Sequence, residues 1–536
     1  MKPYVLISSF WLCAYALEPT TMALEPKTIH FSSTTGGLSH IAWVLEIGQV
    51  LAERGHNVSF LTTDMYTKFG LSYAPHIKTI SLGPHLSKVQ FRDLFDTQET
   101  VSTRVTLAYK TMVQDTYKRD FMAYTDIFTN SNTSLVVCDQ MALPCFDAAK
   151  ALNIPMIMYM TMSLSEDTKA PFISSNHISS QPTTLDQSFT ERLYDRYVMT
   201  PKFVYRYLPV ARAIRKARQE LNIPDFDPLA RHSNAIKMVN SFWGMDSPRP
   251  VGPLVEYVGP IINAVYDSLT QDLSDFMDNH KRIVYVAFGQ MYTPSKEEFQ
   301  VLLTSLVEAY EYNFLDGFIW SLSLKARHDL PEQVTTSSGK VYRVQDLFHH
   351  HMDLRFEPWS PQFAILQHEH CKLFISHGGS SSVHESLYNG VPLLLHPFTS
   401  DQPSNAHNIA NAGVGLVLDR KSHNLTDTLE KLSSILQDKD GQFASNMKSM
   451  QALVQIRSRK KRYAADMIEE VLYSVRNKDD IWHRRQVDAT MSWLKATNWD
   501  VDLFAFVSVI VVYQIIAHAC AFFKLVFVPP MKWKTE

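Results

Sequence analysis

The sequence predicts an α/β protein with two doubly wound parallel sheets, followed by one apolar helix near the C-terminus. Three observations support this prediction: a strand, glycine turn and helix begin at residue 28, a second such unit begins at residue 372, and residues 503–523 carry no formal charge. With 536 residues, of which 45% are hydrophobic, the chain is too long for one hydrophobic core. The net charge of −3 gives no basic excess, so the composition does not indicate a nucleic acid partner.

The first unit starts with a short strand at 28–33, passes through a glycine-containing turn, and enters a helix at 41–54. Apolar residues recur at helical spacing along it, at Ile41, Val44, Leu45, Gly48 and Leu51. Gly55 is the expected C-cap, and a strand at 58–61 completes a βαβ unit. His40 is the titratable residue where this helix begins; taken alone, it would fit a solvent-exposed helix histidine.

A candidate partner for His40 follows another predicted strand. Residues 135–138 are all apolar and predict a buried strand, with Asp139 at its carboxyl end. If the strands are parallel, Asp139 lies on the same edge of the sheet as His40. Two alternatives remain open. Asp139 could cap a turn, or Asp147 in the following helix could take its role, although Asp147 is more typical of an acid that stabilises a helix N-terminus.

The second unit has the pattern of an anion-binding turn. Residues 372–375 predict a buried strand, 376–379 a tight turn with two glycines, and Ser380 opens a helix that Gly390 ends. The free N–H groups and positive dipole end of such a helix attract an anion, and the glycines let a phosphate approach the backbone. His377 lies in this turn; alone, it would fit a turn histidine with satisfied hydrogen bonds.

A further strand at 392–396 follows at once, and Asp401 and Gln402 come after it, where open parallel sheets bind ligands. Ser382 and Glu385 have the spacing of a capping box, in which both side chains satisfy backbone donors without any ligand. Taken alone, this pair favours the cap over a binding role.

The stretch from Trp359 to Gln402 resembles the signature box of the UDP-dependent glycosyltransferases, and it has the length of the plant version. The resemblance implies that each polar landmark contributes to donor binding. Trp359 would stack on uracil, Gln362 would lie near the uridine, His377 would contact the pyrophosphate, Glu385 would bridge the ribose hydroxyls, and Asp401 and Gln402 would hold the sugar hydroxyls. Trp359 by itself would fit a core aromatic residue equally well.

Several positions depart from the family pattern. Where the plant box has Trp-Asn-Ser after its glycines, this chain has Ser380, Ser381 and Ser382, and Gln290 replaces a family Ser near the nucleotide phosphates. With Gly379, the small serines still suit a phosphate turn. The Trp contact to the sugar is lost, so the resemblance defines the nucleotide better than the sugar.

The same resemblance extends to the first unit. The family places its catalytic base at the turn before a helix that ends in Gly-His, a pattern that His40 and His56 match. An Asp at a strand end, followed by a Pro and a helix, orients that base, which matches Asp139 and Pro144. The implied fold is GT-B, with two Rossmann-like domains facing each other across a cleft.

The reaction implied by the resemblance is an inverting transfer of a hexosyl group from a UDP-sugar to a hydroxyl of a small acceptor. UDP-glucose is favoured because Gln402 resembles the glucose-using plant enzymes, although animal glucuronosyltransferases also end this box with Asp-Gln. Neither a cofactor nor a metal is expected. Two other functions stay open: a UDP-sugar-binding protein without transferase activity, and a GT-B-fold nucleotide-sugar epimerase or hydrolase. A homo-oligomer is also compatible with the sequence.

Pro and Gly residues concentrated at 248–260 predict the domain junction. We expect an acceptor-binding domain at 27–250 and a UDP-sugar-binding domain at 258–450. By resemblance, helices at 451–495 return to brace the first domain.

Both ends of the chain have targeting features. Residues 1–16 combine a lysine, an apolar run and an Ala-x-Ala site, which predicts a cleaved signal peptide. Residues 503–523 are long enough to span a bilayer, and the lysines after them place a tail at 524–536 in the cytosol. We expect a single-pass type I protein of the endoplasmic reticulum membrane, with a luminal body and lipophilic acceptors. Asn132 and Asn424 open glycosylation sequons.

The remaining motifs indicate neither disulfides nor metal. Of the five cysteines, Cys138, Cys145 and Cys371 stay outside the signal peptide and the apolar run, and we expect no disulfide framework among them. Residues 225–227 spell the Asp-x-Asp of metal-dependent glycosyltransferases, but the flanking prolines favour a turn. The histidines at 349–351 are more typical of a solvated loop.

Overall fold

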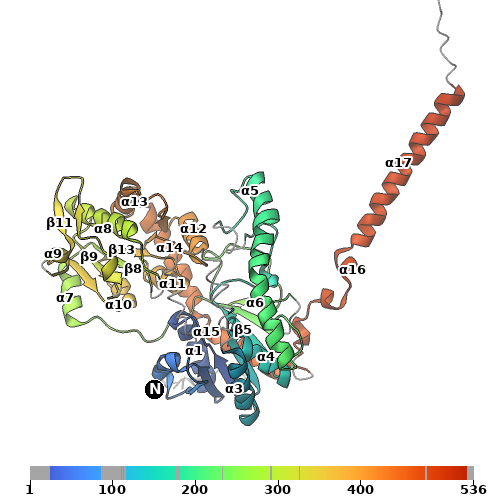
Figure 1. Ribbon diagram of the computed structural model, residues 1–536, viewed down its shortest axis with the longest axis horizontal. Coiled ribbons are helices and arrows are strands. Elements are labelled where there is room, and N and C mark those ends of the chain that lie inside the picture. Colours follow the sequence, from blue (N-terminus) through green and yellow to red (C-terminus); the bar gives the residue numbers. More distant parts are fainter. Residues whose placement is uncertain are drawn as a thin grey trace, which may run out of the picture.

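The computed structural model describes residues 25–85, 110, 113, 116–174, 181–231, 233, 235–289, 292–324, 326–349, 351–476 and 480–527. Two parallel sheets with helices packed on them form the body, and one long helix projects from it (Figure 1). The predicted α/β class with two doubly wound sheets is therefore confirmed. The predicted signal peptide, Gln290 and residues 528–536 of the predicted tail lie outside the described residues.

The N-terminal sheet has seven parallel strands in the order β3-β2-β1-β4-β5-β6-β7. Its strands are β1 (Thr28–Ser32), β2 (Asn57–Thr62), β3 (Lys78–Ser81), β4 (Leu135–Asp139), β5 (Met156–Met160), β6 (Ala235–Val239) and β7 (Val255–Tyr257). The chain builds outward from β1 to β3 and then returns to the other side of β1 with β4, so the strand order reverses between them. Ser32 pairs with Cys138 there. Open parallel sheets bind ligands outside the carboxyl ends of the strands at this point.

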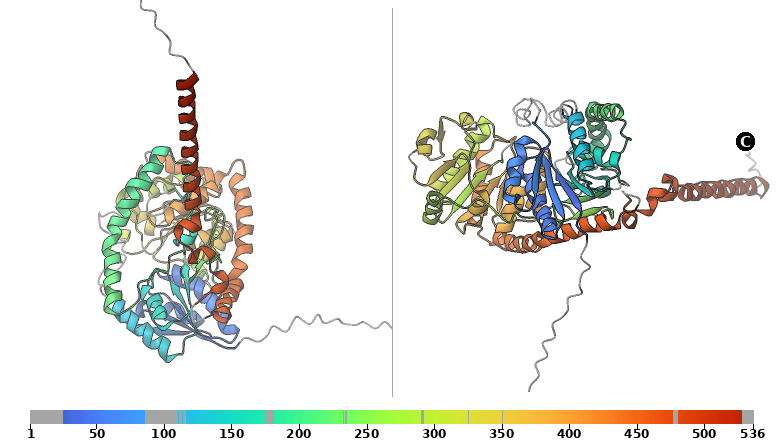
Figure 2. Two further views of the ribbon diagram at one scale, coloured as in Figure 1. Left: turned by 90° about the vertical axis from the view of Figure 1, so that its right-hand side faces the viewer. Right: turned by 90° about the horizontal axis from the view of Figure 1, so that it is seen from below.

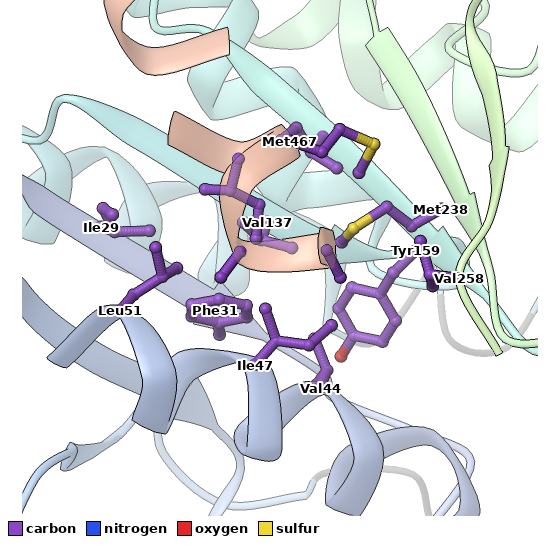
Figure 3. Packing of buried hydrophobic residues seen from close by; sticks show 14 of the residues in the cluster. Ile29, Phe31, Val44, Ile47, Leu51, Val137, Tyr159, Met238, Val258 and Met467 are labelled. Carbon is purple, nitrogen blue, oxygen red and sulfur yellow. The ribbon is translucent and has the colours of Figure 1, made fainter. Parts of the chain in front are cut away.

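Buried apolar residues hold the helices of this half against the sheet. The helical segments are α1 (Leu38–Glu53), η1 (Asp64–Tyr73), α3 (Tyr117–Asn130), α4 (Leu143–Leu152), η3 (Glu166–Thr168), α5 (Phe189–Tyr194), η4 (Asp195–Met199) and α6 (Thr200–Glu220). Figure 3 shows Val44 and Ile47 of α1 beside Phe31 of β1 and Tyr159 of β5. The apolar face expected from the spacing of α1 is thus the face buried in the core.

The C-terminal sheet has six parallel strands in the order β12-β9-β8-β13-β14-β15. They are β8 (Ile283–Ala287), β9 (Gly317–Ser321), β12 (Leu354–Glu357), β13 (Cys371–Ser376), β14 (Leu393–Leu395) and β15 (Gly415–Val417). Here the order reverses between β8 and β13, where Ala287 pairs with Ser376. A small antiparallel pair, β10 (Gln333–Thr335) and β11 (Val341–Arg343), lies apart from this sheet.

The helices of this half are α7 (Gln271–Asn279), α8 (Lys296–Glu311), η5 (Ala326–Asp329), α9 (Val344–His349), α10 (Gln362–Gln367), α11 (Ser380–Asn389) and α12 (Gln402–Asn411). They are followed by α13 (Leu425–Gln437), α14 (Gln442–Arg457), η6 (Ser458–Lys460) and α15 (Lys461–Ser474). Figure 2 shows α14 and α15 running along the body from the second half to the first. In the core of the first half, α15 contributes Met467, Ile468 and Val471.

Polar contacts reinforce this return of the chain. Arg54 at the end of α1 pairs with Asp466 of α15 at 2.6 Å, and His56 Nε2 lies 3.0 Å from Glu469. The side chain of Glu46, in the middle of α1, is only 1% exposed. Its Oε1 accepts hydrogen bonds from the Tyr73 hydroxyl (2.9 Å) and the Ala264 N–H (2.8 Å), and its Oε2 accepts one from Lys461 Nζ (3.0 Å).

The last helix, α17 (Trp499–Phe527), projects away from both sheets (Figures 1 and 2). The most apolar 18-residue window within Trp499–Lys524 has a mean hydropathy of 2.2, and none of that window is buried in the protein. Within the part of the chain that the structure describes, this is the one helix long and apolar enough to cross a bilayer. A short helix, α16 (Trp493–Thr497), precedes it, and Trp493 stacks on Trp499 with ring centroids 6.1 Å apart.

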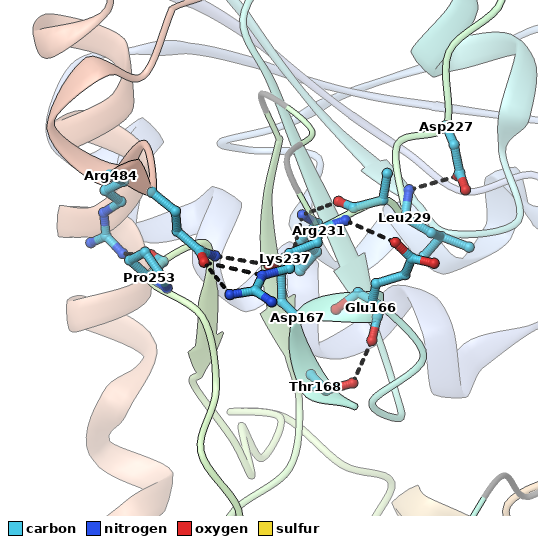
Figure 4. Close-up of polar contacts among 12 residues, drawn as sticks. Glu166, Asp167, Thr168, Asp227, Leu229, Arg231, Lys237, Pro253 and Arg484 are labelled. Carbon is cyan, nitrogen blue, oxygen red and sulfur yellow. Dashed lines mark hydrogen bonds and ion pairs between the residues drawn. The ribbon is translucent and has the colours of Figure 1, made fainter. Parts of the chain in front are cut away.

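A buried ion pair in the first half connects the sheet to the segment after α15 (Figure 4). Lys237 of β6 donates to Asp167 at 2.7 Å, and both side chains are fully buried. Burial lowers the pKa of Lys237, and the hydrogen bond to Asp167 opposes that effect. Gln486, beyond α15, donates to the other oxygen of Asp167 at 3.3 Å and accepts a hydrogen bond from Arg231 at 3.0 Å.

We predict that Asp167→Ala destabilises the protein by about 3 to 5 kcal/mol, because it leaves the buried ammonium of Lys237 without a carboxylate. The paired variant Asp167→Leu/Lys237→Met removes both charges and should retain more stability than the single variant. Thermal unfolding of the full chain in detergent measures both. Equal losses of stability in the two variants would show that the unpaired charge of Lys237 does not cause the destabilisation.

Candidate active site

The structure brings His40 and Asp139 together at the reversal point of the first sheet. His40 lies in the first turn of α1, which follows β1, and Asp139 is the last residue of β4. His40 Nδ1 is 2.7 Å from Asp139 Oδ2. Asp139 is fully buried, whereas the His40 side chain keeps 14% of its surface exposed. With Nδ1 facing the carboxylate, the imidazole presents Nε2 as its second nitrogen.

Asp139 is held by its own turn as well as by His40. Its Oδ1 accepts the N–H of Met141 at 2.8 Å, and its carbonyl accepts the N–H of Ala142 at 2.8 Å. Asp139 therefore combines the predicted partner role with the turn-capping role considered as its alternative. Asp147 does neither: it is buried in α4 and pairs with Arg218 at 2.9 Å, which corrects its interpretation as a first-turn acid that acts on the helix dipole.

Opposing effects set the pKa of His40. Burial lowers it, but the negative charge and hydrogen bond of Asp139 raise it, and the net result lies above the ordinary value. The charge of Asp401, in the second half of the molecule, raises it further. Because Coulomb interactions weaken with distance, this effect indicates that the end of the signature box lies near His40.

The strand, glycine turn and helix predicted at 372–390 are present. The chain leaves β13, turns at Gly378 with a φ of 83°, and enters α11 at Ser380 with Gly379 as its N-cap. No side chain among the described residues caps this helix, so its first N–H groups have no side-chain acceptor. The capping box considered for Ser382 and Glu385 is therefore wrong, because the helix begins two residues before Ser382.

His377 is packed between glycines of two neighbouring strand ends. A Cβ on Gly379 would lie 2.5 Å from His377 Nε2, and one on Gly289, after β8, would lie 3.0 Å from it. Burial lowers the pKa of His377 to about 4, so the imidazole is neutral near pH 7. Its Nδ1 is buried and has no hydrogen-bond partner among the described residues.

Gln362 and Glu385 form one contact across two helices. Gln362 Nε2 donates to Glu385 Oε2 at 2.8 Å and to Ser382 Oγ at 3.2 Å. Burial raises the pKa of Glu385 to about 7, although hydrogen bonds from Gln362 and Tyr266 act in the opposite direction. Trp359 is 59% exposed and is therefore not a core aromatic residue.

The end of the signature box is connected by hydrogen bonds to the glycine turn before α11. Asp401 Oδ2 accepts hydrogen bonds from Ser380 Oγ and Asn405 Nδ2, both at 2.8 Å, and Asn405 also donates to the carbonyl of Gly378 at 2.9 Å. Gln402 is buried, and its Oε1 accepts the N–H groups of Phe398 and Thr399 at 2.8 and 3.1 Å. Ser381 is half-buried in the first turn of α11.

Two further residues of this region were not singled out from the sequence. Asn405 lies one helical turn after Asp401, and that spacing places both on one helix face, which is a signal that could have indicated it. Tyr266 contacts Glu385 and stacks on Phe363 with ring centroids 3.8 Å apart. It lies in an irregular segment between β7 and α7, where no periodic pattern indicates its position.

The Asp-x-Asp motif at 225–227 forms a turn and an ion pair, whereas His350 of the histidine run lies outside the described residues. Asp225 pairs with Arg218 at 3.3 Å, and Asp227 accepts the N–H of Leu229 at 2.9 Å, as expected for a turn. Across the described residues, no group of three or more His, Cys, Asp and Glu side chains could hold a metal ion.

The cysteine expectation was wrong. Cys138 of β4 and Cys145 of α4 form a disulfide bond, with their Cα atoms 6.3 Å apart. Only the packing of α4 against the end of β4 brings the two thiols together. Cys371 is free and buried.

Comparison with known proteins agrees with this arrangement. The family described as "UDP-glucoronosyl and UDP-glucosyl transferase" matches residues 33–532. The chain belongs to this family. A UDP-glycosyltransferase of Talaromyces amestolkiae is 27% identical over 499 residues, which cover 88% of this chain and 93% of that protein. Family membership establishes a glycosyltransferase enzyme that uses a UDP-sugar donor.

Solved structures share the fold. The glycotransferase of kitacinnamycin aligns with a TM-score of 0.61 at 16% identity, covering 83% of this chain and 99% of that chain. The UDP-glucose: anthocyanidin 3-O-glucosyltransferase in complex with UDP aligns with a TM-score of 0.57 at 18% identity, with the same coverage. The predicted GT-B fold is confirmed.

We predict that Gly36→Ala lowers transfer activity by about 100-fold, the loss typical of a small misplacement of a reacting group. Gly36 has a φ of 84°, and a Cβ there would lie 2.4 Å from the His40 ring. Gly37→Ala is the matched control, because Gly37 also has a positive φ, of 69°, but a Cβ on it meets nothing within 4 Å. Steady-state kinetics compare them; similar losses would show that backbone strain, and not the position of His40, is the cause.

Proposed function

We propose that this protein transfers a hexosyl group from a UDP-sugar to a hydroxyl of a small lipophilic acceptor, with inversion at the anomeric carbon. The observation that carries the proposal is the 2.7 Å contact between His40 and Asp139. The negative charge of Asp401, at the end of the signature box, also raises the pKa of His40. A base supported by a buried carboxylate suits the removal of a proton from an attacking hydroxyl.

In this proposal, His40 Nε2 takes the proton of the acceptor hydroxyl while its oxygen attacks the anomeric carbon. The bond between that carbon and the β-phosphate oxygen breaks, and UDP departs. Asp139 stabilises the imidazolium that forms on His40 and keeps the proton of the free imidazole on Nδ1. A single displacement from the face opposite UDP inverts the anomeric configuration.

The departing diphosphate is assigned to the turn after β13. The first N–H groups of α11 and the positive end of its dipole favour the charge that develops there. His377 acts as a neutral donor, since burial keeps its pKa near 4. Neither a metal nor a cofactor is part of the proposal.

Glucose is the sugar that we favour. The closing pair Asp401 and Gln402 supports this choice by resemblance to glucose-using plant enzymes. A panel of UDP-sugars tests the assignment: the highest kcat/KM with UDP-glucose supports it, and a higher value with another UDP-hexose overturns it.

Lipophilic acceptors are supported by α17. An apolar helix that is not buried against the body suits a membrane anchor, which would hold the site beside a bilayer in which such acceptors dissolve. Lys524 at the end of the apolar run supports a cytosolic tail and a body on the other side of the membrane, which we assign to the lumen of the endoplasmic reticulum.

We predict that His40→Ala lowers the rate of acceptor-dependent UDP release by about 100- to 10,000-fold, the usual contribution of general-base catalysis. The test uses the full chain in detergent with a UDP-sugar and a panel of lipophilic alcohols and phenols. His76→Ala, which removes an exposed histidine of the same half, is the control and should retain full activity. Turnover by His40→Ala within a few-fold of the unmodified protein would contradict the mechanism.

The same assay separates the other two functions. UDP release without any acceptor would point to a hydrolase, and binding of a UDP-sugar without release under any condition would point to a binding protein.

We also predict that UDP-glucose binds more tightly as the pH rises toward about 7, and that its affinity levels off above that pH. In the free protein, burial raises the pKa of Glu385 to about 7. Ribose hydroxyls donate to the carboxylate and favour its charged form, so the bound state has the lower pKa and binding strengthens above it. Calorimetry between about pH 6 and 8 measures this change, which Glu385→Gln should abolish. The same pH dependence in that variant would assign it to another group.

A further inference from the structure

The disulfide bond lies at the base of the turn that carries Asp139. Cys138 immediately precedes Asp139 in β4, and Cys145 lies in the first turn of α4. Both cysteines are completely buried, in the cluster that includes Phe146 of α4 and Tyr124 of α3. The bond therefore joins the strand that ends in the candidate catalytic carboxylate to the helix that follows it.

The residues between the two cysteines form hydrogen bonds that orient Asp139. The Met141 N–H holds Oδ1 at 2.8 Å, the Ala142 N–H holds the main-chain carbonyl at 2.8 Å, and the Gln140 N–H bonds to the Tyr159 carbonyl at 3.0 Å. Because Oδ1 is held by this turn, any displacement of the turn also moves Oδ2 relative to His40.

The start of α4 is held by its packing in this buried cluster and by the disulfide, without a side-chain cap. Its N-cap is Ala142, and no side chain among the described residues caps it. The middle of the helix is held by the buried pair of Asp147 and Arg218, and its C-terminal end continues into Asn153 in the left-handed conformation. The covalent bond to Cys138 takes the place of a cap at the end of α4 nearest to Asp139.

We propose that the Cys138–Cys145 disulfide is a positioning element for the transfer reaction, because it holds the turn that keeps Asp139 Oδ2 in contact with His40 Nδ1. This inference rests on the proposed function, in which His40 is the base. It assigns the two cysteines a role that neither thiol could fill alone.

Without the bond, the turn gains conformational freedom, and the contact between Asp139 and His40 is formed for a smaller fraction of the time. Two effects should follow. The value of kcat falls, because the imidazolium loses its partner. The pKa of His40 also falls, because Asp139 raises it in the intact protein, so the acidic limb of the pH–rate profile moves to lower pH.

The experiment compares the full chain with Cys138→Ala/Cys145→Ala and with Cys371→Ala, all in the same detergent. Cys371 is the matched control, since it is a buried, unbridged cysteine at the start of β13, at the opposite end of that strand from the glycine turn before α11. The double variant should lose about 10- to 100-fold in kcat, keep its KM for the UDP-sugar, and show the shifted acidic limb. Cys371→Ala should stay within about twofold of the unmodified protein.

The outcomes are distinct. An unchanged kcat and pH profile in the double variant would overturn the proposal, and so would a fall in kcat without a shift of the acidic limb, since that is the result of a purely structural role. Mass mapping of the unreduced, unmodified protein must also show Cys138 linked to Cys145, and free thiols there would overturn it.

If the double variant does not fold, Cys138→Ala/Cys145→Val, which restores most of the buried volume, replaces it under the same criteria. If the unmodified protein shows no transfer activity, the proposed function fails first. The pKa of His40, measured by NMR in the bridged and unbridged chains, then still tests the bridge: an equal pKa in both chains would overturn it.

Discussion

The parallel pairing of β1 with β4 is the constraint on which the candidate active site depends. These strands are far apart in the sequence, yet Ser32 and Cys138 are paired neighbours, so the two chain segments leave the sheet at the same edge. One segment enters α1 and presents His40, and the other ends in Asp139. The second sheet repeats this geometry at β8 and β13, where Gly289 and Gly379 leave space for His377. In both halves, the candidate site residues therefore lie where the strand order of the sheet reverses.

The helix that carries His40 is also the element through which distant parts of the chain meet. Glu46, in the middle of α1, receives hydrogen bonds from η1, from the segment between the two sheets and from α15. Arg54, at its end, pairs with α15 again. The position of the candidate base is thus set by contacts from both halves of the molecule, and a buried carboxylate makes those contacts specific, because each of its oxygens needs a partner.

Local patterns were the most informative part of the sequence. The strand, glycine turn and helix around His377 were predicted with nearly the bounds that the structure has, because such a turn needs positive φ at Gly378 and a helix that begins at once. The capping box at Ser382 and Glu385 was a wrong alternative, since a motif of two residues cannot tell where a helix begins. The disulfide was missed for a related reason: two cysteines among five show no pairing until the packing of α4 on β4 is known.

The sequence by itself determined the fold class, the family, the glycine turn before α11 and the apolar helix at the C-terminus, because each depends on residues that are neighbours in the chain. Only the tertiary structure decided which polar groups share a site. It placed Asp139 against His40, directed Asp147 to Arg218, brought Asp401 within electrostatic reach of His40, and buried Glu385 beside Gln362. These relations depend on the distance and dielectric surroundings between groups far apart in the sequence, and the folded chain alone sets both.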